Sequence, residues 1–178
     1  MIYTIGHGNR PIDEFLGLLR DAAIECLVDV RAYPASRRHP QFGREALEKS
    51  LAVGGIRYVW EGEALGGRRR PVKDSPHVAL RNPGFRAYAD HMATEEFLWA
   101  LDRLAKAGSG QRTVILCAER LPWQCHRHLI ADCLVTRGVR VLHLLSPGKS
   151  IDHTLNRLAR SDGSRLVYDV GDQFPLEI

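Results

Sequence analysis

The sequence predicts an α/β fold, a three-layer sandwich built on a mainly parallel sheet of about five strands. Short apolar runs rich in β-branched residues alternate with segments whose apolar residues recur at helical spacing. Parallel strands need crossover connections, and helical crossovers cover both faces of the sheet. The chain has 178 residues, which is the usual size of one domain, so we expect a single α/β domain over residues 1–178.

The first half of the chain predicts a strand–helix–strand unit, then a helix and a third strand. Residues 2–5 and 26–30 read as the first two strands. The helix between them is indicated by four apolar residues on one helical face, Ile12, Phe15, Leu16 and Leu19. Residues 44–53 predict the next helix and residues 56–60 the third strand.

Residues 61–83 break this periodicity with glycines, prolines and basic residues, which predicts a long loop. The elements expected after it are helices over 85–92 and 97–105, a strand over 113–117, a helix over 123–136, a strand over 140–144, a helix over 151–160 and a short edge strand near 166–168.

Composition narrows the class of protein. The hydrophobic fraction of 44% and the charged fraction of 26% are those of a globular chain. The sequence has neither a long apolar run nor the basic-then-apolar start of a signal peptide, so we expect a cytoplasmic protein with no membrane association. Four cysteines are too few for a secreted disulfide framework and are expected to be reduced. No cofactor and no oligomeric state can be inferred.

Polar residues follow three of the predicted strands. His7 follows the first strand, Asp29 and Arg31 end the second, and Cys117 and Glu119 end the fourth. In open parallel sheets the ligand cleft lies beyond the carboxyl ends of the strands. We therefore expect these residues to converge in one site, although Asp29 and Arg31 would also make a structural ion pair.

Cys117 is the candidate nucleophile of this site. A thiol at a strand end, near a helix N-terminus and arginines, is held more easily as the reactive thiolate. We assign catalytic roles to Cys117, Glu119, His7 and Asp29, with Glu119 and His7 as acid–base groups. The alternative is that Cys117 is a small buried core residue, which is common for free cysteine.

Cys125, His126 and Arg127 are predicted to lie in the first turn of the helix over 123–136, where backbone N–H groups bind anions. Together with Arg31 they are candidate substrate-binding residues, since arginine pairs with phosphate or carboxylate. The alternative is an ordinary exposed helix start, and His128 is expected to be an exposed polar residue of that kind. His143 is expected to be a core histidine of its strand.

Two other functions stay open. Cys117, Cys125 and a histidine offer ligands that zinc or iron would accept, but their spacing is unlike that of zinc ribbons, so no metal is assigned. The net charge of +4 suits an anionic small molecule or a nucleic acid. The basic residues available to nucleic acid are Arg37, Arg38, Arg44, Arg68, Arg69 and Arg70.

Five short segments together resemble a known family, called domain of unknown function 488: Thr4-Ile5-Gly6-His7, Asp29-Val30-Arg31 with Pro34 and Ser36, Gly66-Gly67, Cys117-x-Glu119 and Cys125-His126-Arg127. The resemblance covers residues 1–144 and implies a compact α/β protein with no settled activity. It adds Ser36, Gly66 and Gly67 to the expected substrate-binding residues.

A weaker similarity is to rhodanese-like domains, carried by residues 27–31, 114–119 and 138–144 (LVDVR, VILCAE and GVRVLHL). By that analogy Cys117 would carry sulfur as a persulfide or attack an anionic substrate. The expectation from the sequence is therefore an enzyme, a cysteine-dependent transferase or hydrolase, acting on a phosphate- or sulfur-bearing anion.

Overall fold

The computed structural model describes residues 1–35, 37–163 and 165–169. Its strands are β1 (Ile2–Gly6), β2 (Cys26–Asp29), β3 (Arg57–Trp60), β4 (Thr113–Cys117), β5 (Val141–Ser146), β6 (Lys149–Asp152), β7 (Ala159–Asp162) and β8 (Arg165–Tyr168). Its helices are α1 (Ile12–Asp21), α2 (Arg44–Val53), α3 (Gly62–Leu65), α4 (Pro83–His91), α5 (Glu95–Gly110) and α6 (Arg127–Thr136), with short 3₁₀ turns η1 (Pro40–Phe42) and η2 (Pro122–Gln124).

The sheet formed by the described residues has six strands in the order β3-β2-β4-β1-β5-β6. Pairing is parallel from β3 through to β5, and only β6 runs antiparallel, beside β5. The α/β prediction and the mainly parallel sheet are thus confirmed. Because β1 lies between β4 and β5, and β4 separates β1 from β2, the carboxyl ends of β2, β4 and β1 are neighbours at the middle of the sheet.

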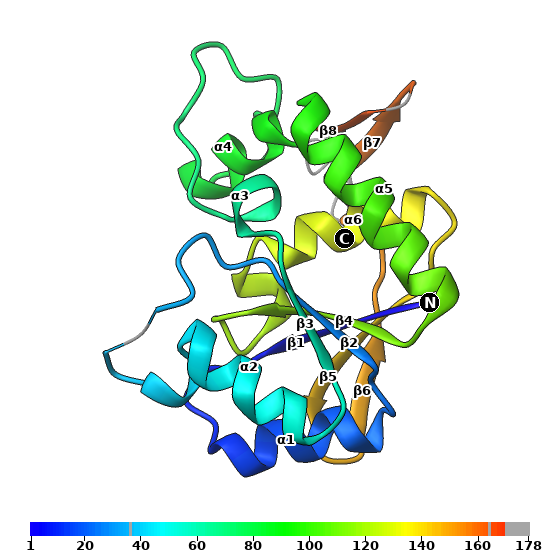
Figure 1. The fold of residues 1–178 in the computed structure, drawn as a ribbon. Helices are drawn as coiled ribbons and strands as arrows, with labels where there is room; N and C mark the ends of the chain where they lie inside the picture. Colours follow the sequence, from blue (N-terminus) through cyan, green and yellow to red (C-terminus); the bar gives the residue numbers. More distant parts are fainter. Residues whose placement is uncertain (36, 164, 170–178) are drawn as a thin grey trace, which may run out of the picture.

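Apolar side chains from both faces of the sheet enter two core clusters. Along β4 the direction alternates, with Val114 and Leu116 in one cluster and Ile115 and Cys117 in the other. This is the period-two pattern of a strand buried on both faces. Helices α1 and α2 supply the first cluster, whereas α4, α5 and α6 supply the second, and Figure 1 shows these groups on opposite sides of the sheet.

The prediction of a helix over residues 151–160 is wrong, because this region contains the end of β6 and the start of β7. Pro147 and Gly148 form a tight turn, with Gly148 at φ +68°, and this turn folds β6 back onto β5. A proline followed by a glycine at positive φ suits such a turn. The spacing of Ile151 and Leu155 imitates a helical face, yet both side chains are exposed. Consequently the sheet gains a sixth strand, and β7 and β8 form a separate hairpin.

Two other boundaries differ from the sequence prediction. The loop expected over residues 61–83 begins with the short helix α3. The helix expected over 123–136 is divided, because Cys125 is extended, with φ −137° and ψ 145°, between η2 and α6. No helix among the described residues has the length and apolar character that crossing a membrane would require.

Candidate functional site

The ends of β1, β2 and β4 meet at one edge of the sheet. Gly6 pairs with Cys117 across β1 and β4, and Asp29 pairs with Leu116 across β2 and β4. Just beyond the strands, the backbone N–H of His7 donates to the carbonyl of Cys117 at 3.1 Å. Residues that are far apart in the sequence are therefore brought together by strand pairing alone.

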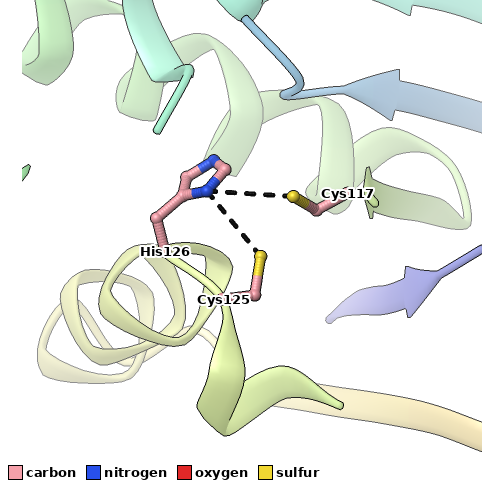
Figure 2. A group of neighbouring side chains, drawn as sticks. All are labelled: Cys117, Cys125 and His126. Atoms are coloured by element: carbon pink, nitrogen blue, oxygen red, sulfur yellow. Dashed lines mark hydrogen bonds between the residues drawn. The ribbon is translucent and has the colours of Figure 1, made fainter. Parts of the chain in front are cut away.

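Cys117, Cys125 and His126 form a compact group, which we call the Cys–His cluster (Figure 2). Nδ1 of His126 lies 3.8 Å from Sγ of Cys117 and 3.7 Å from Sγ of Cys125. Both cysteines are free and buried. Cys125 and His126 lie just before α6 and not in its first turn, where the sequence places them, because the helix begins at Arg127. One imidazole nitrogen therefore faces two thiols.

The other nitrogen of His126 fixes the direction of the ring. Nε2 lies 3.2 Å from the carbonyl oxygen of Val30, at the end of β2, and donates to it. This leaves Nδ1 free to take the proton of a neighbouring thiol. A nucleophile, a base and a third group that orients the base are the parts of an activated nucleophile.

The two thiols of the cluster have opposite acidities. The pKa of Cys117 is well below its ordinary value, chiefly because the Cys125 thiol donates to its sulfur, with His126 and Arg127 adding favourable charge that outweighs burial. The pKa of Cys125 is well above its ordinary value, chiefly because of burial, and its bond to Cys117 adds to this. The backbone N–H of Arg127 also points at Sγ of Cys125, at 3.5 Å. The arrangement favours a Cys117 thiolate beside a Cys125 thiol.

The cluster opens into a pocket of about 330 Å³. Its lining comes from the loop after β2, the end of β4 and the loop after it, the loop after α3, the start of α4, and the segment from η2 to α6: Arg31, Ala32, Tyr33, Gly67, Arg68, Asn82, Gly84, Phe85, Cys117, Ala118, Glu119, Gln124, Cys125 and His126. Cys117 is only 5% exposed, but it borders this space.

Gly66 and Gly67 are packed against the cluster and its surroundings. A Cβ on Gly67 would lie 2.4 Å from Nδ1 of His126, and a Cβ on Gly66 would lie 2.2 Å from the carbonyl oxygen of Gly62. Both distances are shorter than the closest approach of non-bonded atoms. Gly67 therefore allows the loop after α3 to pack against the His126 ring, and Gly66 allows it to pack against Gly62 and Ala32.

His7, Asp29 and Arg31 form a separate buried network. Arg31 donates from Nε and Nη2 to the Asp29 carboxylate, at 2.5 Å for the closest pair, and from Nη1 to the carbonyl of Phe42. Tyr58 donates its hydroxyl to Asp29 at 2.8 Å. Nδ1 of His7 lies 2.9 Å from the carbonyl of Gly8, and burial, followed by the charge of Arg31, lowers the pKa of His7 to about 4. His7 is thus neutral at neutral pH.

Arg127 and Glu119 are placed differently from Cys117. The Arg127 guanidinium is buried and donates to the carbonyls of Glu119 at 2.5 Å and Arg120 at 2.9 Å. It thereby holds the loop after β4 in place. The side chain of Glu119 is exposed at the pocket. Ser36 lies outside the described residues.

The carbonyl of Val30 and the ring of Phe42 are parts of the site that the sequence did not identify. Phe42 stacks on His7 with ring centroids 4.4 Å apart and accepts from Arg31 through its carbonyl. Every residue carries a backbone carbonyl, so no residue type could have marked Val30. The only signal for Phe42 was an aromatic residue close to the basic segment after β2.

The thiol acidity yields a first prediction. At pH 6, iodoacetamide is expected to alkylate Cys117 and to leave Cys125 unmodified, because an ordinary thiol with a pKa of about 8.5 is almost wholly protonated there. His126→Gln should move this reaction to higher pH. Peptide mass spectrometry of alkylated protein across pH measures both effects. Equal modification of all cysteines only above pH 8 would contradict the assignment.

Gly67→Ala is expected to displace the His126 ring and to slow alkylation of Cys117 at pH 6, since the new methyl group would clash with Nδ1 at 2.4 Å. Gly17→Ala is the matched control. Gly17 lies in α1 with nothing within 4 Å of an added Cβ, so alanine should stabilise the fold by about 0.5–1 kcal/mol and leave reactivity unchanged. Equal reactivity in the two variants would show that ring position does not matter.

Asp29→Ala is expected to lower the free energy of unfolding by about 3–5 kcal/mol, because it leaves the Arg31 guanidinium buried without its carboxylate. Tyr58→Phe removes one hydrogen bond to the same carboxylate and should cost about 0.5–1.5 kcal/mol. Urea denaturation of the two variants compares them directly. Similar small losses would mean that Arg31 finds another partner or water.

No curated protein and no solved structure matches the chain. Residues 11–134 match the family described as Domain of unknown function DUF488. The matched segment contains the β2 and β4 ends, both glycines of the α3 loop and the whole Cys–His cluster, but not His7. The chain therefore belongs to the DUF488 family.

Proposed function

We propose that this protein is a cytoplasmic enzyme, a cysteine-dependent transferase or hydrolase, that acts on a phosphate- or sulfur-bearing anion with Cys117 as nucleophile or sulfur carrier. The proposal assumes the three-layer arrangement, in which such sites lie beyond the strand ends. The observation that carries it is the approach of Cys117 Sγ to His126 Nδ1 at 3.8 Å beside an open pocket. The lowered pKa of Cys117 supports it.

The chemistry follows from the cluster. His126 takes the proton of Cys117, and the thiolate attacks the phosphorus or the outer sulfur of the substrate. The bond to the leaving group breaks, and the leaving group departs with the bonding electrons and takes a proton from His126. Water then takes the phosphoryl group, or a second nucleophile such as a thiol takes the sulfur, and its proton passes to His126 as the Cys117 sulfur leaves as thiolate. For a sulfur carrier the intermediate is a Cys117 persulfide.

Within this proposal the basic residues are given roles that differ from the substrate-binding roles expected from the sequence. Arg31 and Arg127 are engaged with Asp29 and with backbone carbonyls, so they contribute charge and hold the loops. Arg68 lines the pocket, is exposed and stacks on Tyr33 at 5.4 Å. We assign anion contact to Arg68 and proton exchange at the pocket rim to Glu119.

The test is to trap the intermediate. Purified protein is incubated separately with thiosulfate and with p-nitrophenyl phosphate, and intact-mass and peptide mass spectrometry seek one added sulfur atom or phosphoryl group on Cys117. The adduct is expected in the wild type and in Cys133→Ala, a cysteine outside the pocket lining, and not in Cys117→Ser. If Cys117 alkylates at pH 6 but neither probe leaves an adduct or is turned over, these two substrate classes are ruled out.

A second candidate function, metal binding by the Cys–His cluster, is favoured by one observation. The donor atoms of Cys117, Cys125 and His126 all lie within 4.8 Å of one another, and the far nitrogen of His126 is held by a carbonyl, as in metal-bound histidines. Two thiolates and an imidazole suit zinc. Elemental analysis of the purified protein would detect a bound ion. Such an ion would also block alkylation of Cys117 until a chelator removed it, which separates the two functions.

Nucleic acid is the remaining candidate partner, supported by the exposed side chains of Arg37, Arg38 and Arg70 together with Arg68. Phosphate contacts release counterions, so such binding would weaken steeply with salt. Absence of gel retardation of DNA and RNA at low ionic strength would remove this candidate.

A further inference from the structure

Three histidines meet on the β5 side of α6, outside the pocket. His128 comes from α6, His143 from β5 and His153 from the segment after β6, and one ring nitrogen of each lies within 4.8 Å of the others. The His128 ring packs edge-on against His153 with centroids 4.7 Å apart, and the His143 and His153 centroids are 5.1 Å apart. We call this group the three-histidine cluster. His143 and His153 lie beyond the segment matched by the family.

Hydrogen bonds fix two of these rings. Nδ1 of His143 lies 2.7 Å from the hydroxyl oxygen of Thr4, and Nε2 of His153 lies 2.8 Å from the Asp132 carboxylate. The remaining nitrogens, Nε2 of His143 and Nδ1 of His153, face each other at 2.9 Å. The His143 and His153 rings therefore each turn one nitrogen outward to a fixed partner and the other inward to the cluster.

Asp132 is itself rigidly held. Its carboxylate accepts from the backbone N–H of Asn156 at 2.9 Å and from the hydroxyl of Tyr168 at 2.9 Å, and its side chain is fully buried. A carboxylate behind a histidine sets the tautomer and strengthens the ring as a metal ligand. It also supplies negative charge beside three imidazoles that carry none when neutral.

His128 distinguishes a metal site from a simple chain of hydrogen bonds. A chain from Thr4 through His143 and His153 to Asp132 would satisfy those groups without His128. Yet Nδ1 of His128 is buried and has no hydrogen-bond partner among the described residues. The sequence suggested an exposed polar residue here, whereas the ring packs against His153. Coordination of an ion through this nitrogen would satisfy it.

We propose that His128, His143 and His153 bind a divalent transition metal of the zinc class, with Asp132 behind His153 and the fourth position left to water. Three neutral imidazoles suit zinc, with metal–nitrogen distances of about 2.0–2.1 Å. The site would tie α6 and β5 to the segment that leads to β7. It shares no residue with the Cys–His cluster and takes no part in the reaction proposed there.

Cobalt reports on the site without assaying activity. The Cys117→Ser/Cys125→Ser double variant, freed of metal with a chelator, is titrated with Co²⁺ and then with Zn²⁺. One equivalent of Co²⁺ is expected to give visible absorption bands without the near-ultraviolet sulfur-to-cobalt band that a thiolate site produces, and Zn²⁺ should displace it. Zinc should also raise the melting temperature, because it binds the folded state.

Substitutions assign the ligands. His128→Gln in the same background should abolish the cobalt spectrum, and Asp132→Asn should weaken binding by about 10- to 100-fold, as loss of an outer-shell partner does. His91→Gln is the control, since His91 lies on α4 and contacts the carbonyl of Ala64. Its spectrum should match that of the parent.

Two results would overturn the proposal: no cobalt binding by the folded double variant, or unchanged binding in His128→Gln. Circular dichroism establishes that each variant is folded. Should the double variant not fold, wild-type protein alkylated at Cys117 replaces it, because the cluster holds no cysteine. Persulfide or phosphoryl trapping on Cys117 succeeds or fails independently of these measurements.

Discussion

The hydrogen bond from His126 to the carbonyl of Val30 is the contact on which the candidate site depends. It joins the end of β2 to the start of α6, two segments almost a hundred residues apart in the chain. Without it the imidazole could rotate, and Nδ1 would no longer be held toward both sulfurs. Parallel pairing of β1 and β4 supplies the complementary constraint, since it sets Cys117 beside Gly6.

Burial explains why two arginines of the site are bound within the protein. A guanidinium removed from water must satisfy its donors within the protein. Arg31 does so on Asp29 and Phe42, and Arg127 on two carbonyls. Arg68 stays exposed in the pocket and keeps its charge available. Residue type alone does not separate these roles, because the partners are mostly backbone atoms.

Much of the fold was predictable because parallel strands buried on both faces are continuous apolar runs, as over residues 113–117. The failure over 151–160 has the opposite cause: β6 is exposed along its whole length and has no apolar pattern to mark it. The residue types of the candidate site were predictable at the strand ends. Their contacts were not, since the positions of Val30, Phe42 and Gly67 follow from backbone geometry.

Helix α6 and the residue before it carry parts of both clusters within seven residues, 126–132. His126 caps the helix, His128 follows in the first turn and Asp132 one turn later. A helix moves nearly as a rigid rod, so a small axial slide that lengthened the Cys117–His126 distance would also shift His128 against β5. Both clusters therefore depend on the position of the same helix, and the packing of α6 fixes the distances within both.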